Sequence, residues 1–155
     1  MTDFNQIAAP ASASGPDDER PVSISARLGR LQFHRSGKFR VLQLADIQDG
    51  PKVSKDTIRL IEASLDAARP DVVIFTGNQI AGYDDAYCDT FRKRQWEPAR
   101  RGKIERTRAK VRAGISAFLQ PLIDRGIPFA VTYGNHDAQC GLSPAELDAL
   151  YREFP

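Results

Sequence analysis

The sequence has few of the residues that crosslink a chain or anchor it in a membrane. Its two cysteines, Cys88 and Cys140, do not stand in a CxxC or CxxH pattern, so neither a zinc knuckle nor a redox motif is indicated. No apolar run approaches the length that crosses a bilayer, and the amino terminus lacks the charged and apolar regions of a signal peptide. We therefore expect free thiols in a reducing compartment, a cytoplasmic location and no membrane partner.

A strong excess of charge of one sign is also missing. The 22 basic and 20 acidic residues give a formal net charge of +2, which is too small to argue by itself for a polyanionic partner. The 155 residues, 41% of them hydrophobic, are enough for one domain with a core. Residues 1–22 are rich in Ala, Ser, Asp and Pro without periodicity and predict a disordered leader. The domain is therefore expected over residues 23–155.

Short apolar runs predict three strands, with helical patterns between them. The strands are expected over residues 39–45, 71–76 and 127–133, and the helices from Ser54 to about Ala68 and from about Gly102 to Asp124. Because strand and helix alternate, we expect the α/β class, with a helix-covered, mainly parallel sheet.

Local signals predict the remaining elements. Residues 23–33 suggest a hairpin at a sheet edge, followed by a turn over residues 35–38, and His34 beside that turn is expected to be a solvated edge histidine. Pro121 is expected to kink the long helix or to start a new turn. The run from Ser143 to Glu146 is a capping box that opens a last helix reaching about Phe154.

Polar residues of the metal-ligand type follow each predicted strand. They form the motifs Asp46-Ile47-Gln48, Gly77-Asn78 and Gly134-Asn135-His136-Asp137. The carboxyl ends of parallel strands meet at one rim of a sheet, so these motifs should converge there. Taken alone, the third motif could equally be turn chemistry after a strand. Convergence of three strand ends favours a functional site.

These motifs resemble those of the calcineurin-like metallophosphoesterase family, which carries Asp-x-His, Gly-Asp and Gly-Asn-His-Asp or Glu on three successive strand ends. The likeness covers roughly residues 27–155 and implies the front half of an αββα sandwich. It also implies a hydrolase that cleaves phosphate mono- or diesters with two divalent metal ions, Mn, Fe or Zn. By this resemblance, the metal ligands would be Asp46, Gln48, Asn78 and Asn135, and the catalytic residues His136 and Asp137, with Asp137 orienting His136.

The sequence differs from the family pattern in its ligand residues. Gln48 stands where the family has a histidine and Asn78 where it has the bridging aspartate, and both changes weaken metal ligation. With only two histidines, His34 and His136, the chain also lacks the family's later histidine ligands. We therefore expect a domain truncated at its carboxyl end that is weak or inactive as this chain. A separate carboxyl-terminal half, or another copy of the chain, could be its partner.

Two other functions stay open. The same rim could serve a non-catalytic module that binds a phosphate group or a metal ion. The basic stretch from Arg92 to Arg112 is the argument for a nucleic-acid partner, but it suits the outer face of a helix and lacks interleaved aromatics, so nucleic-acid binding is not expected. Residues 81–96 read as an ordinary loop, although Asp84 or Asp85 could reach the metals.

Overall fold

The computed structural model describes residues 31, 33–93 and 104–155. Their elements follow in the order β1 (Val41–Leu44), α2 (Lys55–Ala68), β2 (Val72–Thr76), the 3₁₀ turn η1 (Asp85–Tyr87), α3 (Ile104–Asp124), β3 (Phe129–Thr132), the 3₁₀ turn η2 (Asp137–Cys140) and α4 (Pro144–Tyr151). The leader expected over residues 1–22, and residues 23–30 of the expected hairpin, lie outside the described residues.

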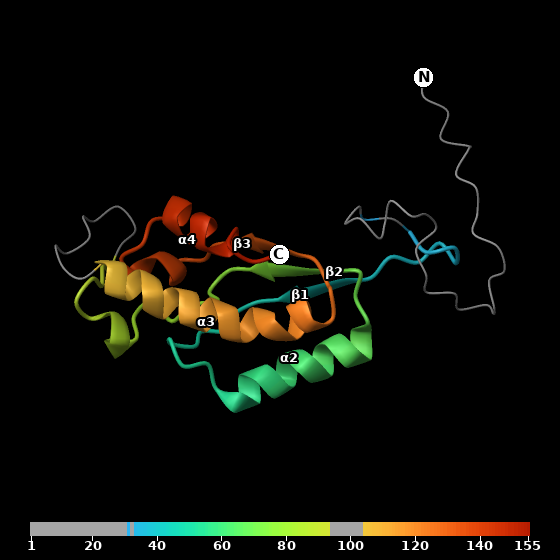
Figure 1. Ribbon diagram of the computed structural model, residues 1–155, viewed down its shortest axis with the longest axis horizontal. Coiled ribbons are helices and arrows are strands. Elements are labelled where there is room, and N and C mark those ends of the chain that lie inside the picture. The colour runs from blue at the N-terminus through green and yellow to red at the C-terminus, as the bar shows by residue number, and fades with distance from the viewer. Residues whose placement is uncertain (1–30, 32, 94–103) are drawn as a thin grey trace, which may run out of the picture.

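The three strands form one parallel sheet in the order β1-β2-β3 (Figure 1). In the central strand, Val73 pairs with Leu42 of β1 and with Phe129 of β3. Helix α2 connects β1 to β2, and α3 connects β2 to β3. The predicted α/β class and parallel sheet are confirmed, and all three strand ends point to the same rim.

The helices begin at the predicted signals. The Ser54 hydroxyl caps α2 by accepting a hydrogen bond from the Thr57 N–H at 3.1 Å. The capping box of Ser143 and Glu146 is present at the start of α4, which ends at Tyr151, three residues before the predicted end. Each cap satisfies N–H groups that have no partner within the helix.

The long helix α3 continues through Pro121 to Asp124, so of the two effects expected of the proline, a kink or a new turn, the new turn does not occur. Pro121 removes one backbone donor, but it lies in the last turn, where the fully buried Leu122 holds the helix against the core.

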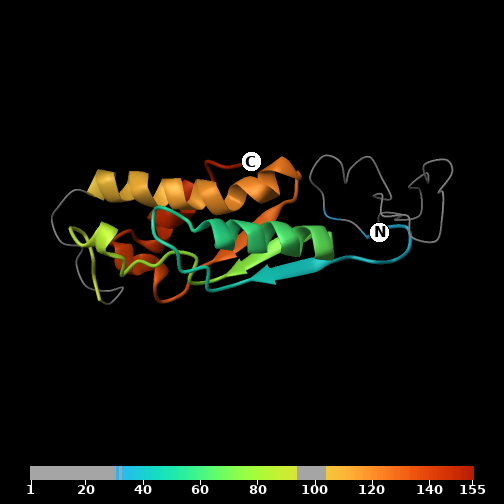
Figure 2. The same cartoon turned by 90° about the horizontal axis from the view of Figure 1, so that it is seen from below.

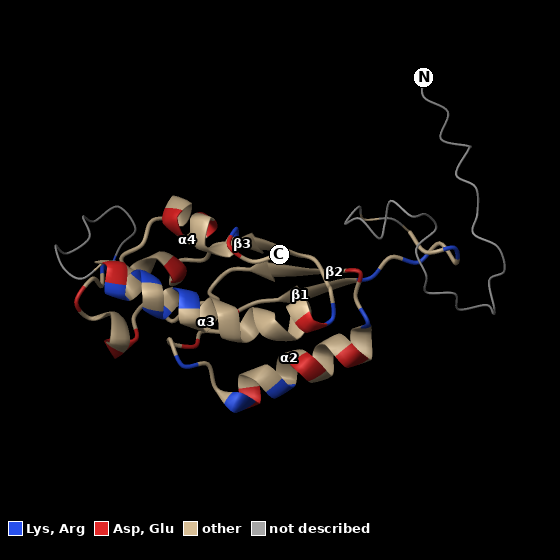
Figure 3. Cartoon of the chain, in the orientation of Figure 1, with Lys and Arg blue, Asp and Glu red and all other residues tan. Residues whose placement is uncertain are grey.

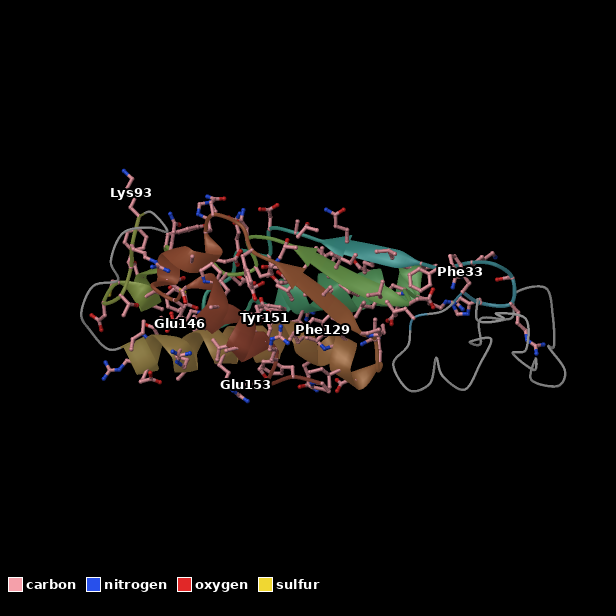
Figure 4. The ribbon with its side chains drawn as sticks, turned by 90° about the horizontal axis from the view of Figure 1, so that it is seen from above. Phe33, Lys93, Phe129, Glu146, Tyr151 and Glu153 are labelled. Carbon is pink, nitrogen blue, oxygen red and sulfur yellow. The ribbon has the colours of Figure 1, made fainter. Side chains whose placement is uncertain are left out.

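One face of the sheet carries the hydrophobic core. Figure 2 shows α2 and α3 on the same side of the strands. Phe75 of β2 is fully buried there, and its ring lies 5.5 Å from the Phe118 ring of α3. Helix α4 closes the β3 side, where Phe129 and Tyr151 lie next to each other with ring centroids 6.5 Å apart (Figure 4). Each such buried side chain contributes about 1.5–3 kcal/mol to folding.

The opposite face of the sheet carries no helix from the described residues (Figure 2). Burial alternates along the two outer strands, and Val41 is 53% exposed on this face. Gln43 and Thr76 also lie on it and hydrogen-bond to each other at 3.0 Å. The face is therefore part apolar and part polar.

We predict that this open face makes the chain associate with itself. Parallel strands are normally buried on both sides, so Val41 and Ala130 should favour contact with another copy or with a hydrophobic dye. Replacing both by Thr should lower dye fluorescence about twofold and shift sedimentation toward the monomer. Leu60→Thr is the control, because Leu60 is 69% exposed on α2. A chain that sediments as a monomer and binds no dye would refute the prediction.

The prediction for His34 is wrong. His34 is only 9% exposed, and its Nε2 lies 2.5 Å from Asp71 Oδ1, while Asp71 Oδ2 accepts the Arg40 N–H at 2.7 Å. The turn predicted over residues 35–38 is present, with the His34 N–H bonded to the Lys38 carbonyl at 2.9 Å. That turn brings the imidazole back onto the residue preceding β2, so His34 ties the start of β1 to β2.

Some basic residues of the stretch from Arg92 to Arg112 make contacts that hold the fold together. Figure 3 shows the Lys and Arg residues of α3 on its amino-terminal half. There Arg108 pairs with Glu146 of α4 at 2.9 Å, and Lys110 donates to the Ala86 carbonyl at 2.5 Å. These contacts agree with the view that the basic residues belong to a helix surface.

Among the helices of the described ranges, none combines the length and apolar character that a bilayer crossing requires.

Candidate functional site

Beyond β1 and β2, the two chain segments stay side by side. The Asp46 N–H donates to the Gly77 carbonyl at 3.1 Å, and the Gln48 N–H donates to the Asn78 carbonyl at 3.0 Å. An isolated parallel bridge between Asp49 and Ile80 continues this pairing. The polar residues after the first two strands are therefore held in register by backbone hydrogen bonds, at the rim that the parallel topology predicts.

Three of the residues at this rim have a strained backbone. Asp46, Gln48 and Asn78 have φ values of 53°, 46° and 57°, in the left-handed region that residues other than Gly seldom adopt. Such conformations cost about 1–3 kcal/mol each and persist only where the surroundings enforce them. Their grouping at one rim is typical of a functional site.

The third strand end packs directly on the second. A Cβ built on Gly134 would lie 2.1 Å from Asn78 Oδ1, and one built on Gly77 would lie 2.9 Å from the Gly134 nitrogen. Gly77 also has a φ of 115°. Both positions therefore need glycine, because a side chain at either would push the two loops apart.

Asp137 joins these two loops from beneath. Its side chain is fully buried, and its oxygens accept hydrogen bonds from the backbone N–H groups of Asn78 and Gly134 at 2.7 Å and of Ile80 at 2.9 Å. Burial raises the pKa of Asp137, and the three N–H donors act against that rise. Asp137 is thus the acceptor around which the rim is built.

An amide and carboxylate network covers the outer side of the rim. Asp46 Oδ1 accepts hydrogen bonds from Asn78 Nδ2 and Gln48 Nε2, each at 3.0 Å. Asn78 Oδ1 accepts the His136 N–H at 3.0 Å, and Gln48 Oε1 accepts the Tyr83 hydroxyl at 3.0 Å. Both ends of each amide therefore have partners, which fixes their orientation. One connected network links all three strand ends.

The network favours the ionised form of the Asp46 carboxyl. Asp46 is exposed, and the hydrogen bonds from Asn78, then from Gln48, hold the pKa of its carboxyl below the ordinary value. The nearby His136 adds a smaller effect in the same direction. The amide donors of Asn78 and Gln48 therefore stabilise the carboxylate more than His136 does.

His136 lies at the same rim, but Asp137 does not orient it. His136 Nδ1 pairs with Gln139 Oε1 at 2.8 Å, and the Tyr83 ring meets the His136 ring edge-on, with centroids 4.9 Å apart. The expected orienting role of Asp137 is therefore wrong, because its carboxylate is turned inward to the loop N–H groups. Gln139 and Tyr83 were missed as site residues. The spacing of three residues between His136 and Gln139 was the available signal, since side chains at that spacing align in a 3₁₀ turn.

The remaining candidates are less involved. Asn135 is exposed between Gly134 and His136, and its side chain makes no hydrogen bond with any residue in the described ranges. Asp84 caps η1 by accepting the Ala86 N–H at 2.7 Å, so its carboxylate serves that turn. Asp85 is the exposed first residue of η1. The rim thus brings together Asp46, Gln48, Asn78 and His136, with Asn135 beside them.

Comparison with known proteins shows which family this sequence matches. The family described as calcineurin-like phosphoesterase matches residues 39–155. The phosphatase DCR2 of Saccharomyces cerevisiae is 27% identical over 151 residues, covering 88% of this chain and 22% of that protein. From Arabidopsis thaliana, the probable inactive purple acid phosphatase 28 is 26% identical (76% of this chain, 28% of that protein), and the probable inactive purple acid phosphatase 29 is 24% identical (77% and 29%).

The chain spans less than a third of the length of these relatives. No solved structure matches it. The family match covers β1 to α4 and every residue of the strand-end rim. The chain belongs to the calcineurin-like phosphoesterase family.

Proposed function

We propose that this chain is a phosphoesterase-family domain that binds a phosphate ester at the strand-end rim and, as the 155-residue chain, hydrolyses it weakly or not at all. The observation that carries the proposal is the network in which Asn78 joins Asp46 to His136. In this network the residues that follow the strands lie together, and their polar atoms hydrogen-bond to one another.

The family generally uses divalent metal ions, and the residues at this rim do not fit a centre of two such ions. Two cations at close range need anionic ligands between them, whereas Asn78 and Gln48 present amide N–H donors to Asp46. The carboxylate of Asp137 is buried on backbone N–H groups. In the part of the chain that the structure describes, no three side chains of His, Cys, Asp or Glu form a group that could hold a metal ion.

The rim offers contacts for a phosphate ester without a metal. The His136 imidazole is half-buried beside the exposed Asn135, and the ring of Tyr83, 49% exposed, lies edge-on against it. We propose that His136 lies next to a phosphoryl or leaving-group oxygen, where it can donate or accept a hydrogen bond. The hydrogen bonds among Asp46, Gln48 and Asn78 favour the alternative function, a non-catalytic module that binds a phosphate group, over a hydrolase. Two relatives bear the word inactive in their names, and we extend that property to this chain as part of the proposal.

The test combines binding with turnover. With phenyl phosphate added, amide resonances of Asn78 and His136 should shift, whereas those of α2 should not. With an aryl phosphate and an aryl phosphodiester, in the presence of Mn, Fe or Zn, turnover should stay near the uncatalysed rate. His136→Ala and Asn135→Ala are the site variants, and Arg59→Ala on the exposed side of α2 is the control.

Two results would contradict the proposal. If phenyl phosphate shifts no amide resonance, the chain does not bind a phosphate ester at this rim. Robust metal-dependent turnover that is lost in both His136→Ala and Asn135→Ala, but kept in Arg59→Ala, would mean that the rim assembles a working metal centre.

A further inference from the structure

Gln139 is fixed at both ends of its side-chain amide. Its Nε2 donates to the Lys93 carbonyl at 3.1 Å, and its Oε1 lies 2.8 Å from His136 Nδ1. The opposite amide orientation would place two oxygens face to face at Lys93, so the network selects this one. The backbone is also held, since the Gln139 N–H donates to the His136 carbonyl and the Gln139 carbonyl accepts the Arg92 N–H, both at 3.0 Å.

This arrangement determines which nitrogen of His136 carries the proton. An amide oxygen only accepts hydrogen bonds, so Nδ1 must be the donor, and in the neutral ring Nε2 then has the free lone pair. We propose that Gln139 is a positioning residue that holds neutral His136 with its proton on Nδ1 and presents the Nε2 lone pair at the strand-end rim.

The surroundings of the ring agree with this role. The edge-on Tyr83 ring limits rotation of the imidazole, and Tyr83 is in turn held by its hydroxyl on Gln48. Among the described residues, no side chain or backbone group takes His136 Nε2 as a hydrogen-bond partner. The nitrogen is therefore available to a ligand. Any use of this nitrogen toward a bound ligand rests on the proposed function, but the tautomer does not.

The other histidine supplies an internal contrast. His34 meets the Asp71 carboxylate through Nε2, so its proton belongs on Nε2, and its buried Nδ1 has no partner among the described residues. The chain has two histidines in all. One molecule should thus contain both neutral tautomers, each in a known position.

The experiment is nitrogen-proton correlation NMR of the imidazole rings at a pH where both rings are neutral. His136 should show the proton on Nδ1 and His34 on Nε2. Gln139→Leu removes the acceptor and should move the His136 proton toward Nε2, whereas Gln139→Glu keeps an acceptor oxygen and should retain it on Nδ1. Tyr83→Phe keeps the ring contact and should leave the tautomer unchanged. His34 should not change in any of these variants.

Either of two NMR results would overturn the proposal. A His136 ring with its proton on Nε2, or a His136 tautomer that is the same in Gln139→Leu as in the parent, would show that Gln139 does not position it. If phenyl phosphate fails to bind while His136 keeps its proton on Nδ1, the positioning role of Gln139 is supported and the proposed function is what fails.

Discussion

Asp137→Ala is expected to lower the free energy of unfolding by about 3–5 kcal/mol, since three N–H donors, that of Ile80 buried and those of Asn78 and Gly134 part-buried, would lose their acceptor. That is a large share of the stability of an ordinary domain. The loss should be local at first, because the donors belong to the two loops that follow β2 and β3. Equilibrium unfolding in urea measures the total effect. Hydrogen exchange at the Asn78, Ile80 and Gly134 amides shows where it arises.

Two further variants sharpen this result. Asp137→Asn keeps one acceptor oxygen but turns an amide N–H₂ toward backbone donors, so it should also be strongly destabilised. Asp56→Asn on α2 removes a carboxylate that is 91% exposed and should change stability by less than about 0.5 kcal/mol. If Asp137→Ala loses less than about 1 kcal/mol, or the three amides keep their protection from exchange, Asp137 is not the acceptor that builds the rim.

Gln48→His combined with Asn78→Asp is expected to raise the affinity for divalent metal ions at least about a hundredfold. The reason lies in the present hydrogen bonds. Asn78→Asp would replace an N–H donor 3.0 Å from Asp46 by a second carboxylate, and the repulsion between them is relieved by a cation. Gln48→His would add an imidazole ligand beside them. Without metal, the double variant should melt below the parent chain, and added Zn or Mn should restore its melting temperature.

The matched control places the same residue types on another pair. Gln43 and Thr76 also hydrogen-bond at 3.0 Å, but on the open face of the sheet. Gln43→His combined with Thr76→Asp should gain much less metal affinity, because Gln43 and Thr76 bond to each other, whereas Gln48 and Asn78 both bond to the Asp46 carboxylate. Equal gains in both double variants would mean that the strand-end rim has no special geometry for a metal.

The three strands and the meeting of their carboxyl ends at one rim could be predicted from local signals and the alternation of strand and helix. Neighbouring residues in the sequence determine the apolar runs, the cap of α2 and the capping box of α4. Because crossovers between parallel strands are right-handed, few arrangements of these elements are possible. The glycines and polar residues after each strand then had to meet at one edge. That part of the site follows from topology alone.

The roles of individual side chains could not be predicted in the same way. His34 finds a partner 37 residues away, which no local pattern reveals. Asp137 was expected to turn toward its neighbour His136, but three N–H donors from two loops hold it inside. Gln139 took the place beside His136 because of a short 3₁₀ turn, an element that hydrophobic periodicity does not predict. These choices depend on which buried donors and acceptors must be satisfied, and hence on the whole fold.

We propose that the amide hydrogen bonds from Asn78 and Gln48 to Asp46 leave this rim without a two-metal centre. Calorimetric titration of the unaltered 155-residue chain with Mn or Zn, with Asp46→Asn as the site variant, tests it most directly. We expect no binding of two ions at micromolar concentration and no difference between the parent chain and Asp46→Asn. Two ions bound per chain at micromolar affinity, lost in Asp46→Asn, would contradict it.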